Sequence, residues 1–145
     1  MFDLDSALRH LIESGGSDLH LKVPSQPMTR VNGRLLPLPG AEPLTPEVTR
    51  GIVETLLTSD ALRREFEQEN EVDQAFAVSG LARFRVNAFH QRGSVSLVMR
   101  AIPHEIKTVE ELGLPPVIGE LADEERGIIL VTGTTGSGSR RRSRR

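Results

Sequence analysis

The residues best suited to chemistry stand in the segment GIILVTGTTGSGSRRRSRR, residues 127–145. A phosphate-binding loop has the pattern G-x-x-x-x-G-K-[ST] directly after a strand, and its backbone N–H groups surround a polyphosphate. The first six positions of that pattern are Gly133, Thr134, Thr135, Gly136, Ser137 and Gly138. The β-branched run before them is typical of a strand that is buried on both faces. We therefore predict a partial nucleotide-binding loop, with a flexible glycine-serine linker as the alternative.

The last two positions of the loop depart from the pattern. The expected lysine neutralises the β- and γ-phosphates, and the serine or threonine after it holds Mg²⁺. This chain has Ser139 and Arg140 instead. Because the lysine is missing, we do not expect this polypeptide to hydrolyse ATP.

Arginines in the middle of the chain form a second candidate set. Arg83 and Arg85 are two residues apart in the alternating segment LARFRVNAFHQ, so they share one face of a strand. Arg92 stands near the turn that follows, and Arg100 ends the next alternating segment. A solvated polar face of an antiparallel sheet is the alternative interpretation of these arginines.

The elements that position these residues follow from hydrophobic periodicity. A period of 3.6 residues predicts helices over 2–14, from Thr45 onward, and from Ser59 or Asp60 to about Gln68. Alternation predicts strands in SDLHLKV, QPMTRVNGRLLPL, EVDQAFAV, LARFRVNAFHQ and GSVSLVMRAIP. The pairs Asn32-Gly33 and Ser79-Gly80 predict hairpin turns within this set. The segment 108–122 predicts a short helix, a break and a second helix.

These elements predict an α+β fold with a distinct C-terminal end. Residues 1–102 form an antiparallel sheet with helices packed on one face. Residues 103–126 form a linker with short helices, and residues 127–138 form the first strand and partial loop of a second, α/β domain. Residues 139–145 form a disordered tail with five of the 18 basic residues of the chain.

Composition excludes several classes of site and protein. The 145 residues include no cysteine, so disulfides and thiolate chemistry are excluded, and no apolar run is long enough to cross a membrane. The acidic N-terminus does not resemble a secretory signal, which makes the cytoplasm the expected compartment. The four histidines lack metal-ligand spacing, and we predict that His20 is a surface or capping residue. We expect Asp18 to position a backbone turn and the acidic run 65–73 to be a solvated helix end and strand start.

The motifs together resemble the PilT-like type IV pilus retraction ATPases of the type II/IV secretion ATPase superfamily. The matching segments are SDLHL, PMTRVNG, ARFRVNAFHQRG, RAIP, EELGLPP and RGIILVTGTTGSG, although Thr134 stands where the family usually has proline. The resemblance implies a PAS-like N-terminal domain followed by a RecA-like ATPase domain. It implies ATP and Mg²⁺ as cofactors, a hexamer, and pilus assembly proteins of the inner membrane as partners. It also implies that Arg83, Arg85 and Arg100, and less directly Arg92, contact nucleotide phosphates.

The resemblance stops at Ser139, where the family continues Lys-Ser-Thr-Thr-Leu-Ala-Ala-Met. Deletion of one base from the lysine codon of a GC-rich gene converts that run into Ser-Arg-Arg-Arg-Ser-Arg-Arg-stop, which is the sequence of residues 139–145. We therefore expect a frameshifted N-terminal piece of a retraction ATPase, a monomer or weak oligomer that binds no cofactor productively.

Two functions of other classes remain open. One is an autonomous PAS-like module that binds a ligand or another protein. The other is a nucleic-acid binder that uses its arginine tail, which we expect to be weak and without sequence preference.

Overall fold

The computed structural model describes residues 2–102, 108–128, 130 and 132. The chain divides into two compact units, Met1–His104 and Glu105–Arg145. The glycine-rich loop at 133–138 and the tail at 139–145 lie outside the described residues.

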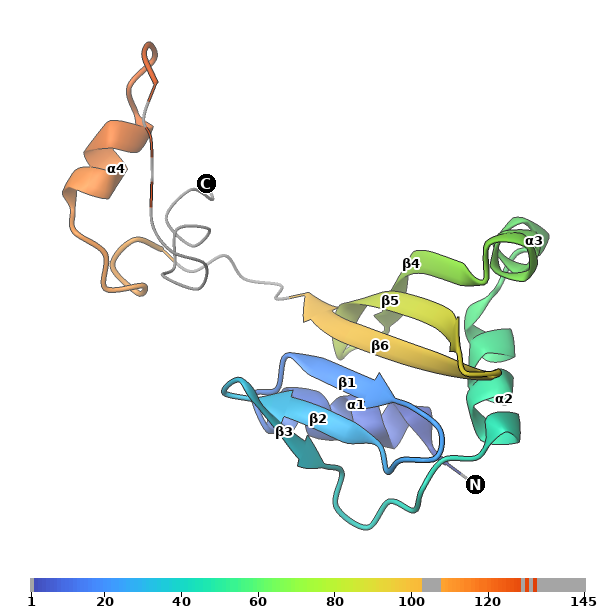
Figure 1. Ribbon diagram of the computed structural model, residues 1–145. Coiled ribbons are helices and arrows are strands. Elements are labelled where there is room, and N and C mark those ends of the chain that lie inside the picture. Colours follow the sequence, from blue (N-terminus) through green and yellow to red (C-terminus); the bar gives the residue numbers. More distant parts are fainter. Residues whose placement is uncertain (1, 103–107, 129, 131, 133–145) are drawn as a thin grey trace. The chain divides into compact units, whose positions relative to one another are not determined.

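The first unit contains a six-stranded sheet in which all neighbouring strands run antiparallel (Figure 1). The strand order is β3-β2-β1-β6-β5-β4, so the last strand along the chain, β6, lies beside the first. The strands are β1 Asp18–Leu21, β2 Met28–Val31, β3 Arg34–Pro37, β4 Glu71–Val78, β5 Ala82–Gln91 and β6 Ser94–Ile102.

Short turns set the register of the hairpins. Asn32 and Gly33 connect β2 to β3 with φ angles of 49° and 81°. Positive φ at both central residues defines the turn whose twist matches paired strands. The strands β5 and β6 are joined in the same way through Arg92 and Gly93, with Gln91 opposite Ser94.

Three helices accompany the sheet, and a side-chain oxygen caps the start of each. They are α1 (Leu4–Glu13), α2 (Pro46–Leu56) and α3 (Asp60–Glu69). Asp3, Thr45 and Ser59 accept hydrogen bonds from the first free backbone N–H groups of these helices. Such caps stabilise a helix by about 1 kcal/mol each.

The core lies between the helices and one face of the sheet. Alternate residues of β5 are buried, namely Ala82, Phe84, Val86 and Ala88, and the residues between them are exposed or half-buried. These β5 residues pack with buried residues of α1, α2, β1 and β6 in one hydrophobic cluster. The predicted α+β architecture, an antiparallel sheet with helices, is therefore confirmed.

Two expectations for the second unit differ from the structure. Thr108 and Glu111 cap each other reciprocally, but the turn they begin ends at Gly113, whose φ is +61°. The predicted helix there is thus a turn only, whereas the second helix forms as α4 (Val117–Ala122).

The run 127–132 also differs from its prediction. At its described positions it is not a strand, and Ile128 and Leu130 are 88% and 82% exposed. A β-branched run becomes a buried strand only when neighbouring strands accept its backbone hydrogen bonds. Within the described residues no strand pairs with it.

Candidate functional site

Three of the four candidate arginines come together on the face of the sheet that the helices leave open. Arg85 on β5 lies directly opposite Arg100 on β6. Arg83 is two residues before Arg85, so its side chain leaves the sheet on the same side. We call these three residues the arginine patch. All three are exposed.

Arg92 does not belong to the arginine patch. It occupies the turn between β5 and β6, at the opposite end of these strands from Arg83. Seven residues of extended chain separate it from Arg85, which is roughly 23 Å. The structure therefore separates Arg92 from the other three candidates.

The arginine patch is joined to a buried carboxylate. The Asp18 side chain is only 4% exposed, and its Oδ1 accepts a hydrogen bond of 2.7 Å from Arg100 Nε. Its Oδ2 accepts a bond of 2.7 Å from Ser17 Oγ and lies 3.4 Å from Arg30 Nε. Asp18 thus binds arginines from both neighbouring strands, β2 and β6.

Electrostatics keep Asp18 ionised. Burial raises the pKa of its carboxyl group, but the hydrogen bonds from Ser17 and Arg100 and the charge of Arg100 outweigh burial and hold the pKa below its usual value. The carboxylate therefore carries its charge throughout the neutral range.

Asp73 on β4 pairs with the second arginine of the patch. Its Oδ1 and Oδ2 lie 3.0 and 2.9 Å from Arg85 Nε, and this bonding lowers the pKa of the Asp73 carboxyl group. Arg85 and Arg100 are like charges directly opposite each other, an arrangement that destabilises a sheet. Asp73 and Asp18 offset that repulsion. Within the described residues, Arg83 has no such carboxylate partner.

His20 lies two residues after Asp18 on the open face and is half-buried. Its Nε2 is buried and has no hydrogen-bond partner in the described part of the chain. Burial, followed by the charges of Arg30 and Arg100, lowers the pKa of the imidazole, and Asp18 opposes this shift. The capping part of the prediction is wrong, because His20 lies within β1, and the side chain is partly at the surface, where it lines a shallow hollow between β1, β2, β5 and β6.

The lowered pKa of His20 makes the stability of the fold pH-dependent. The unfolded chain, in which the His20 pKa is about 6.5, binds this proton more readily than the folded chain. The stabilising contribution is complete above about pH 6.5 and is lost as the pH falls toward the folded pKa. Urea denaturation should give a lower unfolding midpoint at about pH 5.5 than at about pH 7.5.

A matched pair of variants isolates this effect. His20→Gln should flatten the dependence between the two pH values, whereas His10→Gln, on α1, should retain it. An unchanged slope in His20→Gln would show that other groups cause the dependence.

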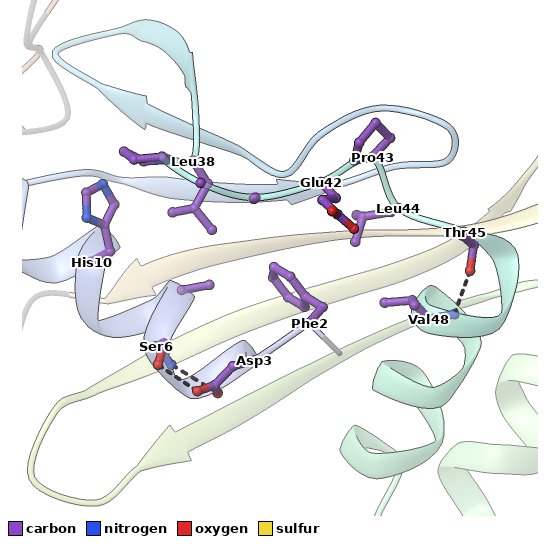
Figure 2. A pocket seen from close by; sticks show the side chains of 14 residues that line it. Phe2, Asp3, Ser6, His10, Leu38, Glu42, Pro43, Leu44, Thr45 and Val48 are labelled. Atoms are coloured by element: carbon purple, nitrogen blue, oxygen red, sulfur yellow. Dashed lines mark hydrogen bonds between the residues drawn. The ribbon is translucent and has the colours of Figure 1, made fainter.

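A groove of about 660 Å³ lies on the helical side, between α1, the loop 38–45 and the start of α2 (Figure 2). Some of its polar groups are engaged in capping: Ser6 donates to Asp3, and Thr45 accepts from the backbone N–H of Val48. The side chains of His10 and Glu42 also line the groove, and neither takes part in a cap within the described residues. A ligand site needs polar groups that are free to orient the ligand. The groove therefore keeps the alternative of a PAS-like ligand-binding module open.

Among residues 2–102, 108–128, 130 and 132, there is no group of three or more histidine and carboxylate side chains that could hold a metal ion. In the same ranges, no helix has the length and apolar character needed to cross a membrane.

Comparison with known proteins decides the family. The chain is 41% identical over 138 residues to the type IV pilus retractation ATPase PilT of Pseudomonas aeruginosa, covering 94% of this chain and 39% of that protein. It is 40% identical over 136 residues to the type IV pilus ATPase PilU of the same organism, covering 94% and 35%. The crystal structure of the pilus retraction motor PilT with bound ADP superposes with a TM-score of 0.80 and 34% identity, covering 98% of this chain.

The chain belongs to the PilT-like pilus ATPases. It matches their N-terminal part and spans less than half of the length of these relatives. No family model matches the chain.

The carboxylate partners of the arginines in this PilT-like chain differ from what the sequence predicts. Asp18 is expected at a backbone turn and Asp73 in a solvated acidic run, yet both bind arginines of the patch. One feature of the sequence could have indicated the role of Asp73. It is an acidic residue in the strand that is predicted to pair with the strand of Arg85. Arg30 was not a candidate, because the pairing of β1 with both β2 and β6 cannot be derived from its local sequence.

Proposed function

We propose that this chain is the N-terminal domain of a type IV pilus retraction motor and that its arginine patch contacts the phosphates of ATP. The observation that carries this proposal is the convergence of Arg83, Arg85 and Arg100 on one exposed area of the open face. Guanidinium groups match the geometry of phosphate oxygens and bind them through paired hydrogen bonds. The relative with a solved structure binds ADP, which is consistent with this role.

The remaining parts of the motor belong to the same proposal. We also expect the glycine-rich loop at 133–138, which lies outside the described residues, to bind phosphate and Mg²⁺ in the family hexamer, which meets pilus assembly proteins at the cytoplasmic face of the inner membrane. Since Ser139 replaces the loop lysine, this chain by itself is not expected to turn over ATP. Its contribution is binding of phosphate by positioned positive charge.

ATP binding to arginine variants tests the proposal. The full chain should bind ATP weakly at low salt, and Arg83→Ala or Arg100→Ala should reduce the affinity about threefold to tenfold, as expected for loss of an exposed charge-assisted hydrogen bond. Titration followed by NMR chemical shifts gives both the affinity and the residues that respond.

Arg63→Ala on α3 is the matched control, because it removes the same charge from an exposed pair with Asp60 away from the open face. Equal losses in Arg63→Ala and Arg100→Ala would mean that ATP responds to net charge only, and the arginine patch would then have no special role.

A further inference from the structure

The Asp18 carboxylate is the point at which three strands of the open face meet. Asp18 on β1 stands opposite Arg30 on β2 and opposite Arg100 on β6. Both of its oxygens are engaged: Oδ1 binds Arg100, and Oδ2 binds Ser17 and faces Arg30. The side chain of Asp18 is 4% exposed, whereas those of Arg30 and Arg100 are 34% and 66% exposed. A buried anion thus holds two cations that reach the surface.

The geometry of the bond determines which part of Arg100 remains available. Its Nε donates to Asp18 over 2.7 Å. The guanidinium group is planar and rigid, so a bond at Nε restricts the orientation of the whole group. The two terminal amino groups make no hydrogen bond within the described residues, and they form the fork that binds two phosphate oxygens at once.

Arg30 is fixed in a similar way. Its Nε lies 3.4 Å from Asp18 Oδ2, and its Nη1 donates to the backbone carbonyl of Gly33 over 3.0 Å. The Arg30 guanidinium is therefore held at both ends beside Asp18, and it adds a positive charge next to the arginine patch.

We propose that Asp18 is a positioning residue for phosphate binding, which orients Arg100 through its Nε so that the terminal fork faces the ligand. This inference rests on the proposed function, because it assumes that the arginine patch binds phosphate. It assigns a role in binding to a residue that touches no ligand itself.

The ion pair of Asp73 with Arg85 differs from that of Asp18 with Arg100 in the solvent exposure of its carboxylate. The Asp73 side chain is 39% exposed and that of Arg85 is 66% exposed, so water competes for both groups. Exposed pairs of this kind contribute little and hold their geometry weakly. Asp18 is shielded from water, and its bond to Arg100 holds a single orientation more firmly.

The direction in which Asp18→Asn changes the affinity for an anion distinguishes orientation of Arg100 from simple electrostatic attraction. Asp18→Asn removes one negative charge near the phosphate and retains the size of the side chain. Coulombic attraction alone would therefore strengthen anion binding in this variant. If Asp18 orients Arg100, the variant binds the anion more weakly in spite of its additional positive charge.

Binding of inorganic triphosphate to the full chain is the first test. Asp18→Asn should lower the affinity about threefold to tenfold, the effect of losing one oriented charge-assisted hydrogen bond. Asp60→Asn on α3 makes the same charge change away from the open face and should leave the affinity unchanged. An Asp18→Asn variant that binds triphosphate as tightly as the unaltered chain, or more tightly, would overturn the inference.

Solvent exchange of the arginine Nε–H groups, measured by NMR without any ligand, is the second test. In the unaltered chain the Nε–H of Arg100 should exchange more slowly than that of Arg83, and Asp18→Asn should bring the two rates together. Equal rates in the unaltered chain would overturn the inference, and this comparison does not depend on whether the variant folds. Absence of triphosphate binding combined with a slow Arg100 exchange would overturn the proposed function, and Asp18 would then orient Arg100 without a role in phosphate binding.

Discussion

Replacement of Phe84 by alanine is expected to lower the free energy of unfolding by about 3–5 kcal/mol. Phe84 is the third residue of β5, it is fully buried, and it faces the hydrophobic cluster under the helices. Truncation removes the ring from the core and leaves a cavity that the neighbouring side chains refill only in part. Denaturation with urea, followed by circular dichroism, measures the change.

Phe89 provides the control on the same strand. It is five residues further along β5 and therefore points to the opposite face, where it is half-buried at the edge of the shallow hollow beside His20. Phe89→Ala should cost clearly less than Phe84→Ala. Similar losses for both variants would mean that the two faces of β5 are equally buried, in conflict with the one-sided core.

Replacement of Gly16 by alanine is expected to destabilise the fold by about 1–3 kcal/mol. A Cβ atom at this position would lie 2.6 Å from Leu11 Cδ1 and 3.0 Å from the Leu11 carbonyl oxygen. It would also lie 3.2 Å from the carbonyl oxygen of Arg30, so two backbone segments as well as a core side chain would have to move. Leu11 is completely buried and has little room to adjust. The unfolding midpoint in urea should fall accordingly.

Gly51→Ala is the matched control for this substitution. Gly51 is an exposed position within α2, and a Cβ atom there meets nothing within 4 Å. Alanine restricts the unfolded chain and favours the helix, so this variant should gain about 0.4–1 kcal/mol. If both variants shifted stability in the same direction, close packing around Gly16 would not be the cause.

The close packing of Gly16 against Leu11 and Arg30 also connects the hydrophobic core to the candidate site. Gly16 ends the turn between α1 and β1, and the next two residues are Ser17 and Asp18. Ser17 donates its backbone N–H to the Arg30 carbonyl and its hydroxyl to Asp18. A displacement of this turn should therefore disturb the ion pairs of Asp18 with Arg30 and Arg100 as well as the packing of α1.

Much of the architecture could be predicted from the sequence because the signals for it are local. The caps Thr45 and Ser59 mark helix starts, and Asn32-Gly33 marks a hairpin. Each of these signals acts over a few residues through the backbone, so no distant contact is needed to interpret it. The alternation in β5 likewise predicted that Arg83 and Arg85 share a face, and the pairing register bears this out.

Local patterns failed where burial or pairing depends on distant segments. The run 127–132 has the composition of a buried strand, yet its described residues are exposed and unpaired with any described strand. The composition of a segment indicates that it can form a buried strand, but burial also requires neighbouring strands that pair with it. The turn at 108–113 shows the same limit, since a well-capped start did not lead to a helix.

The sequence by itself determined the order of the elements over residues 2–102, the inward face of β5 and the family of the chain. Only the tertiary structure decided which charges meet, because the order β3-β2-β1-β6-β5-β4 places β6 beside β1 and brings Arg100 to Asp18 across 82 residues of chain. Alternation made Asp18 a polar, outward-facing residue, and it is buried because Arg30 and Arg100 close over it from both sides. Strand order is a long-range property, and the electrostatics of the candidate site follow from it.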